Sequence, residues 1–598
     1  MPPTRRQWIT PARAKALGRF LRIGAFTVLG ITALTLILVL IHRGLLPVVA
    51  WLFPSLQKPF FDLAVYGAYP TREFVSFGLN APTPSRVLWD DSCDGGFILV
   101  SPNGPSVPQS GPMILDTNGE LVWMSHDYDS IMNFNVQLYK GEQYLTFWAG
   151  NKQGSTGKGD MLMLDSNYKV AYRIRAVGEG NKGDLHEFRL TDEGTALITV
   201  FNNTQADLRK MSGFRGADGW VTDGMFQEVD IETNELLFEW RAIDHFKPED
   251  TNYFDPFGGY TESHPFDYYH LNSIEKDSKG NYLISSRHFH SISYLDGKTG
   301  DVLWVLGGGS KDFTDLSDGL CTEHQWQHNA RWIDEEKGIL SFMDNGVAGP
   351  LHVDAPYSKG TIVQLDLDDM TATHVQSYVS KDKVRSASQG NLQVLDNGNI
   401  LVGWGATAAY SEFLNDGTLL CEVHYAAAWA FWWERWKSYR VYRIHGWVGA
   451  PEYPPSAQIK HGRLYVSWNG ATEVRYWELQ AAREGAEGDS AFESIDIVEK
   501  NTFESSFILP SEGDYVRYRV AAMDGEKKVL HHSDPIEPDG GSGSVVGVIL
   551  GICAGIGSAV GVWYLVRTWA RRRRVGKKLF TWEPTELFTR ERYQYSKL

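Results

Sequence analysis

The sequence predicts an all-β protein: a six-bladed β-propeller followed by a smaller β-sandwich, with a transmembrane helix on each side of the pair. Three observations lead to this prediction. Residues 85–450 contain a degenerate repeat, residues 451–536 contain alternating strands outside that repeat, and an uncharged apolar run stands before and after these regions. The chain of 598 residues is long enough for several domains, and its 59 glycines and 21 tryptophans favour a turn-rich β protein.

The repeat has six copies. Each copy has a short apolar strand, a second strand that ends in Asp or Asn, a polar turn and a third strand, and in five copies a further strand precedes these. Three or four strands per copy, at a spacing of roughly 50 to 70 residues, indicate propeller blades. An array of β-sandwiches is the alternative, but it does not require an aromatic residue at the same place in successive copies. The turns begin at Asp116, Asp165, Asp230, Asp296, Asp366 and Asn415.

Residues 451–536 break the repeat. Strands are expected at 464–468, 476–480, 505–509 and 515–521. An early Trp468 and a late Tyr-x-x-Tyr-x-Val pattern resemble a fibronectin type III sandwich. Residues 537–543 are rich in Gly and Ser and are interpreted as a linker.

Two apolar runs, residues 23–41 and 544–566, are long enough to cross the ~30 Å hydrocarbon core of a bilayer. Residues 1–22 and 567–598 carry clusters of Arg and Lys, and such flanks remain in the cytosol. We therefore expect both termini inside, with residues 42–84 as a connecting segment and both β domains in a secretory lumen or outside the cell. A signal peptide is the alternative for the first run, but no small-residue cleavage site stands out.

Other features bear on partners and location. Glycines at four-residue spacing (Gly547, Gly551, Gly555) allow the second span to pack against the first or to form a homodimer. Asn202 begins a glycosylation sequon, which fits a secretory lumen. A net charge of −16 argues against nucleic-acid binding. Four cysteines exclude a disulfide-dense scaffold, and Cys93, Cys321 and Cys421 supply at most one bridge.

Three histidines occupy the same repeat position in consecutive blades. His186, His270 and His328 stand at the start of the first strand of each blade, which lines the channel of a propeller. Arg287 and His288 follow the strand at 282–285. We expect all five side chains at one end of the channel, where functional groups collect.

Two other interpretations of these histidines remain open. Each could brace neighbouring blades through hydrogen bonds. Together they could bind a metal, but no neighbouring carboxylate and no His-x-His spacing indicates one, so neither a metal nor a cofactor is predicted. The sequence contains no Gly-rich phosphate loop and no Gly-x-Ser-x-Gly elbow.

Several motifs resemble the arylsulfotransferase (ASST) family, in particular its fungal membrane-bound branch. They are 270–274, 285–288, 296–304, 327–328, 342–346, 389–393 and 398–405. The resemblance implies a six-bladed propeller that moves a sulfuryl group from a phenolic sulfate ester to another phenol without a nucleotide sulfate donor (PAPS). A histidine carries the group as sulfohistidine, while other histidines and an arginine stabilise the transferring oxygens.

The resemblance assigns His270 and His328 to the channel histidines, and Arg287 or His288 to the sulfate oxygens. Candidate substrate-binding residues in the same motifs are Asn272, Asn329, Asp344, Asn345, Gln389 and Asn391. Two departures matter, because no arginine follows the Asp-Asn-Gly at 344–346 and no histidine lies in 385–390, where the family has its nucleophile. Three alternatives remain: another histidine such as His328 is the nucleophile, this branch catalyses a different reaction, or it catalyses none.

The expected function is therefore a membrane-anchored lumenal enzyme acting on a small aromatic substrate, a phenol or an aryl sulfate. The location is the secretory pathway or the cell surface. Alternatives are another tailoring reaction on aromatic secondary metabolites, a metal-dependent enzyme on the same channel, and a non-catalytic receptor or scaffold. Sandwich modules beside a membrane usually bind partners or act as spacers, which motivates the receptor or scaffold alternative.

Overall fold

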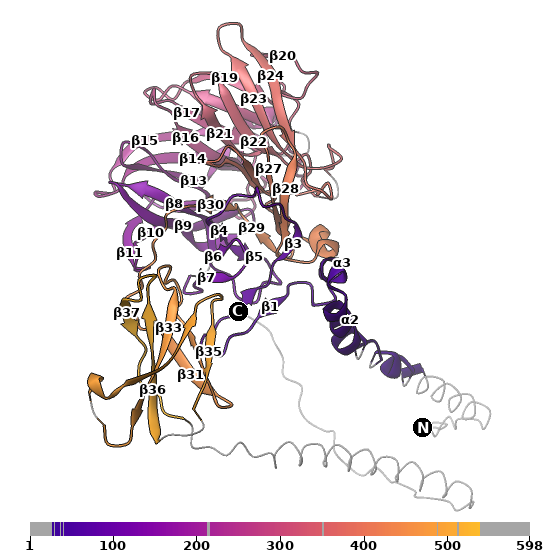
Figure 1. Ribbon diagram of the computed structural model, residues 1–598. Coiled ribbons are helices and arrows are strands. Elements are labelled where there is room, and N and C mark those ends of the chain that lie inside the picture. The colour runs from indigo at the N-terminus through magenta and orange to yellow at the C-terminus, as the bar shows by residue number, and fades with distance from the viewer. Residues whose placement is uncertain are drawn as a thin grey trace, which may run out of the picture. The chain divides into compact units, whose positions relative to one another are not determined.

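The structure is a computed structural model that describes residues 27–538, except 29, 36, 40, 129, 212–215, 350–351, 487 and 511–513. Most of this part is β-structure (Figure 1). Residues 27–39 are helical wherever they are described. Short elements follow them: η1 Ile41–Leu45, α2 Leu46–Leu52, η2 Pro54–Leu56, α3 Gln57–Asp62, and the strands β1 Thr71–Arg72 and β2 Ala81–Pro82.

The two predicted membrane spans are only partly covered by the described residues. Within that coverage, every helix falls short of the length and apolar character needed for a bilayer crossing. Residues 23–26 of the first predicted span, and the whole of 544–566, lie outside the described residues.

Within the described residues, six four-stranded antiparallel units follow one another along the chain. The first is β30 Tyr442–Ile444, β4 Phe97–Val100, β6 Met113–Asp116 and β7 Leu121–Met124; the second is β8 Ser130–Tyr139, β9 Glu142–Gln153, β10 Thr156–Leu164 and β11 Val170–Ile174; the third is β12 Gly183–Leu190, β13 Thr195–Ala206, β14 Gly219–Asp230 and β15 Leu236–Arg241. The second and third units form one sheet through the pair Gly159 and Gly183.

The remaining units repeat the arrangement. The fourth is β16 Leu271–Lys276, β17 Tyr282–Ser286, β18 Ser291–Leu295 and β19 Val302–Gly307; the fifth is β21 His328–Asp334, β22 Ile339–Asp344, β23 Lys359–Asp366 and β24 Thr371–Tyr378, with β20 Thr314–Asp315 on its edge; the sixth is β25 Asn391–Val394, β26 Ile400–Gly403, β27 Ala409–Phe413 and β28 Leu419–His424. Short connections are η3 Ala242–Asp244, η4 Pro248–Asp250, η5 Ala428–Trp433, and β5 Pro102–Asn103 paired with β29 Lys437–Ser438.

The six predicted hairpins are present. In every unit the polar turn joins the third strand to the fourth, and the two strands pair antiparallel. The aromatic residues that follow three of these turns, Trp123, Trp240 and Trp304, are buried. Trp304 stacks on Tyr294 of the neighbouring strand at 5.1 Å between ring centroids, which explains why an aromatic recurs there.

Strands from the two ends of the repeat region complete its first and last units. The first strand of the first unit is β30, whose Tyr442 pairs with Leu99 of β4. The edge strand of the sixth unit is β3 Ser85–Leu88, whose Leu88 pairs with Glu422 of β28. A disulfide between Cys93 and Cys421 fastens the same edge, with 6.4 Å between the Cα atoms. This satisfies the expectation of at most one bridge, and Cys321 is a buried free thiol.

The C-terminal described region consists of two facing sheets. One is β31 Ser456–Lys460, β32 Arg463–Ser467 and β35 Ser505–Ile508; the other is β34 Glu493–Glu499, β33 Tyr476–Arg483, β36 Tyr515–Met523 and β37 Val529–His532, with η6 Asp489–Ala491 between strands. Their shared core contains the fully buried Trp477, and the predicted early Trp468 is buried as well.

Candidate active site

The five predicted catalytic side chains line one cavity of about 390 Å³. His186 lies on β12, His270 immediately precedes β16, and His328 begins β21. Arg287 and His288 come directly after β17. The repeat position therefore places groups from three consecutive units around a single space, as predicted.

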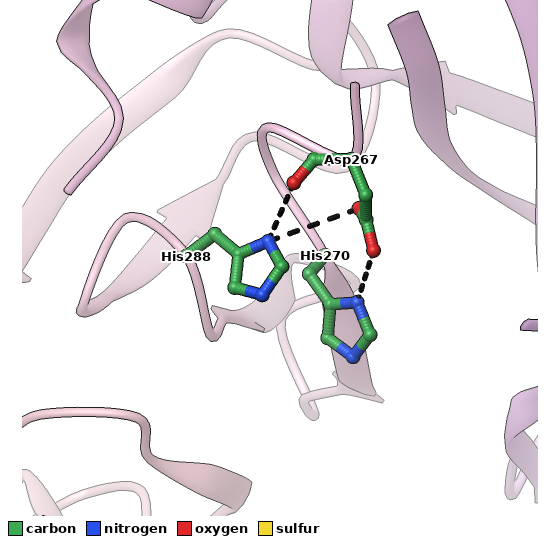
Figure 2. Close-up of side chains that lie close together, drawn as sticks. All are labelled: Asp267, His270 and His288. Atoms are coloured by element: carbon green, nitrogen blue, oxygen red, sulfur yellow. Dashed lines mark hydrogen bonds and ion pairs between the residues drawn. The ribbon is translucent and has the colours of Figure 1, made fainter. Parts of the chain in front are cut away.

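Asp267 orients two of the histidines (Figure 2). His270 Nδ1 lies 2.5 Å from the Asp267 Oδ2 atom, and His288 Nδ1 lies 2.5 Å from the Asp267 carbonyl oxygen. The two rings are 4.6 Å apart between centroids. Burial opposes ionisation of the Asp267 carboxylate, but His270 and His288 hold its pKa below the usual range. Each ring is thus anchored through Nδ1, which leaves Nε2 for chemistry in the cavity.

His186 has a similar support. Its Nδ1 lies 2.5 Å from the Asp184 Oδ1 atom, and its ring meets that of His270 edge-on with 4.7 Å between centroids. Among the described residues, no hydrogen-bond partner meets the Nε2 atoms of His186, His270 and His288. Burial lowers the pKa of His186 and lowers that of His288 further, so both rings are neutral near pH 7.

His328 is held at both ring nitrogens. Its Nδ1 lies 2.6 Å from the Gly390 carbonyl oxygen, and its Nε2 lies 3.0 Å from the Tyr439 hydroxyl. Burial and the charge of Arg440 lower the pKa of His328 well below its usual value. A ring with both nitrogens engaged is a poorer nucleophile than His270, so the suggestion that His328 replaces the missing late histidine is not favoured by this geometry.

The cavity carries positive charge. Arg287 donates hydrogen bonds to the carbonyl oxygens of Trp326, at 2.8 Å, and Ala387, and burial lowers its pKa only to about 10, so it is protonated at neutral pH. Lys152 of β9 and Lys437 of β29 line the same space. These three cations face two carboxylates, Asp255 and Asp267, and the balance favours an anionic ligand.

A buried ion-pair network joins the strands that carry these residues. The Glu187 carboxylate lies 2.5 Å from Arg331 and 2.8 Å from Arg440. Arg440 also donates to the carbonyl oxygens of His186 and Asn272, each at 3.1 Å. The guanidinium groups hold the pKa of Glu187 down at about 2 against the opposing effect of burial. The network fixes the backbone behind two of the cavity histidines.

Of the predicted substrate-binding residues, Gln389 lines the cavity and the four asparagines do not. Instead, the Asn329 backbone N–H donates to the Asn272 side-chain oxygen, and the other three side chains donate to backbone carbonyl groups between strands: Asn272 to Gln327, Asn345 to Ser386 and Gln389, and Asn391 to Val441. These side chains are buried, so they satisfy peptide groups that water cannot reach, which explains their place in the motifs.

Asp344 also lies away from the histidine cavity. It lines a second cavity of about 330 Å³ and forms an ion pair with Lys359 at 3.6 Å. Asn202 is exposed on β13, a position open to a glycan.

Several cavity residues were missed in the sequence. Asp267 stands three residues before His270, and an Asp-x-x-His spacing could have identified it, so the expectation of no neighbouring carboxylate was wrong. Tyr253 and Tyr439 come from irregular segments without a local pattern, and the ring of Tyr253 stacks on that of His288 with 4.1 Å between centroids.

Within the described residues, ligand atoms of Asp267, His270 and His288 lie within 4.8 Å of one another and could hold a metal ion.

Fold and site together define a β protein with a buried, cationic, histidine-lined cavity. Residues 135–426, which contain all five predicted catalytic residues, match the family model of arylsulfotransferase (ASST). This match supports an arylsulfotransferase domain in that part of the chain. No curated protein matches the chain.

Solved structures resemble the chain only weakly. A protein of unknown function from Bacteroides caccae is 14% identical, covers 59% of this chain and 100% of its own, and has a TM-score of 0.35. The periplasmic gluconolactonase of Pseudomonas aeruginosa is 8% identical with coverages of 74% and 96% and a TM-score of 0.31. The Cps50 (Swd1) β-propeller domain of Myceliophteria thermophila is 9% identical with coverages of 57% and 95% and a TM-score of 0.28.

Proposed function

We propose that this protein is a membrane-anchored, lumenal arylsulfotransferase that moves a sulfuryl group between phenolic compounds without a nucleotide sulfate donor. In this proposal the six four-stranded units are propeller blades, residues 451–536 are a fibronectin type III-like module, and residues 23–41 and 544–566 tether the chain to a membrane. The observation that carries the proposal is the cationic cavity in which His270 is anchored by Asp267, inside the region that matches the family.

The first step forms a sulfohistidine. The His270 Nε2 atom attacks the sulfur of an aryl sulfate, the N–S bond forms as the S–O bond to the aryl group breaks, and the phenolate leaves with the electron pair. Asp267 supports this role because it holds the proton on Nδ1 and keeps the lone pair on Nε2. The charge of Arg287 stabilises the oxygens of the transferring group.

The second step returns the sulfuryl group to a phenol. His288 is neutral and its Nε2 has a free lone pair, so it accepts the proton of the incoming phenol. The phenol oxygen then attacks sulfur, the N–S bond breaks, and His270 is restored. His288 passes its proton to solvent, which returns both histidines to their starting state. This division of roles accounts for the lack of a histidine in 385–390, because His270 serves as nucleophile in its place.

The detergent-solubilised full chain tests the proposal. With p-nitrophenyl sulfate as donor and phenol as acceptor, we expect nitrophenol release that depends on phenol and yields phenyl sulfate in equal amount. Rapid quenching with ³⁵S-labelled donor should trap an acid-labile label on the protein. Release of inorganic sulfate alone, or no turnover with any aryl sulfate, would count against a transferase.

The pH dependence of the acceptor step tests His288. Because burial lowers the pKa of His288 well below the usual value of 6.5, its neutral form persists as the pH falls through 6.5. With donor saturating, we expect a constant transfer rate between pH 8 and pH 6.5 and an acid limb whose midpoint lies below 6.5. The variant His288→Gln should lose this limb together with most of the transfer rate, and a midpoint at or above 6.5 in the wild type would remove His288 from the base role.

A metal-dependent reaction is a second candidate, because Asp267, His270 and His288 could hold an ion. It predicts stoichiometric metal in the purified protein and loss of turnover with a chelator. The sulfuryl-transfer proposal predicts activity that a chelator leaves unchanged. A receptor or scaffold role predicts neither turnover nor label.

A further inference from the structure

Five large aromatic side chains are exposed on two short helices. Trp429, Trp432 and Trp433 lie on η5, and Trp51 and Phe53 lie on and directly after α2. Their exposed fractions range from 46% to 76%. We call these five residues the tryptophan face. The rings of Trp429 and Trp433 are in contact, with 4.3 Å between their centroids. Exposed aromatic surface of this kind usually marks an interaction surface rather than a surface left to water.

The two helices are linked through α3, which contacts both of them. α3, which follows α2, packs against η5, and the two lie next to each other in Figure 1, where η5 is the short orange helix beside α3. His424 at the end of β28 lies 2.8 Å from the Asp62 carboxylate of α3, and the Ala427 amide donates to the Ala68 carbonyl at 2.9 Å. The sixth unit therefore holds α3 and η5 together.

The chain before α2 indicates what covers the tryptophan face. Residues 27–39 are helical wherever described, and their apolar side chains, such as Ile31 and Leu34, are more than half exposed. Ten residues separate Ile41 from Trp51, which is about 15 Å of helix. Trp51 and Phe53 thus lie within a short distance of the apolar segment, and tryptophan is enriched where a bilayer meets water.

We infer that the tryptophan face rests in the headgroup layer of the bilayer that the proposed tether enters. The inference rests on the proposed membrane anchoring and adds a second, peripheral contact to it. This contact would also bring the histidine cavity close to the bilayer. Lys437 lines the cavity and follows Trp433 by four residues, so the two Cα atoms are at most about 15 Å apart. The cavity rim then lies near the lipid headgroups.

Spin labels test the contact in the full chain. In a Cys553→Ser background, which leaves the buried Cys321 as the remaining free thiol, Trp432→Cys is labelled with a nitroxide and the protein is reconstituted in phosphatidylcholine nanodiscs. Leu138→Cys on β8 is the matched control, because Leu138 is as exposed as Trp432, at 64% against 62%. We expect at least a fivefold higher ratio of oxygen to nickel-chelate accessibility at position 432 than at position 138.

The outcomes separate the possibilities. Equal accessibility ratios at the two positions, in protein that floats with liposomes, overturn the tryptophan face and leave the tether intact. Failure of the full chain to float with liposomes overturns both. Dipolar broadening at position 432 that disappears on dilution with unlabelled protein assigns the face to a second copy of the chain and also overturns the inference. None of these results depends on sulfuryl transfer.

Discussion

Replacing His270 with Ala is expected to reduce phenol-dependent release of nitrophenol from p-nitrophenyl sulfate by about 10³-fold or more. His270 is the cavity histidine whose Nδ1 is anchored by a carboxylate at 2.5 Å and whose ring lies between those of His186 and His288. Loss of the ring removes the atom that accepts the sulfuryl group, so the labelled intermediate should vanish with the turnover. Initial rates and the ³⁵S label on the protein measure the two effects together.

The variant His374→Ala is the matched control. His374 lies on β24, outside the cavity, with its Nε2 atom 2.8 Å from the Ser377 hydroxyl. We expect its turnover to stay within about twofold of the wild type, as for a change that touches no reacting group. If His270→Ala retains more than a tenth of wild-type turnover, or if His328→Gln instead loses the label, the nucleophile has been assigned to the wrong ring.

The position of the candidate site could be predicted because it follows from a repeat. Equivalent positions in successive units of a repeat meet equivalent surroundings, so three histidines at one position must gather at one end of the first strands. What could not be predicted is the division of labour among them. His270 and His328 share the repeat position, but only the structure shows that His328 is engaged at both nitrogens while His270 faces Asp267. The motif asparagines lie outside the histidine cavity, and their buried hydrogen bonds show that pairing with the backbone constrains a residue as strictly as a substrate does.

The fold shows a similar limit. Hairpins are local, and all six were predicted from polar turns between apolar strands. The first unit lacked a preceding strand in the sequence because its partner, β30, comes from 442–444, more than 300 residues later. Pairing at that separation leaves no periodic trace in a single sequence. Tyr439 reaches the cavity from the irregular segment between β29 and β30, which has no counterpart in the other units, so the repeat did not point to it.

Replacing Glu187 with Ala is expected to lower the free energy of unfolding by about 3 to 5 kcal/mol. The Glu187 side chain is 1% exposed and lies between Arg331 and Arg440, whose side chains are 11% and 2% exposed. Its removal leaves two buried guanidinium groups without their carboxylate, which is the costly way to break a buried pair. Urea unfolding of the detergent-solubilised full chain, followed by tryptophan fluorescence, measures the difference.

Glu232→Ala provides the comparison, because Glu232 pairs with Lys140 at the same 2.5 Å distance but the two side chains are 46% and 64% exposed. Solvent screens that pair, so its loss should lower the free energy of unfolding far less than Glu187→Ala does. The pH supplies a second check. Arg331 and Arg440 lower the pKa of Glu187 from the usual 4.5 to about 2 in the folded protein, so the contribution of the ion pair to stability is present above pH 4.5 and is lost as the pH falls towards 2. The difference in the free energy of unfolding between wild type and Glu187→Ala should therefore be constant from pH 7 to pH 5 and shrink below pH 4.5. A small difference at pH 7 would show instead that the two arginines find water or other partners when the carboxylate is gone.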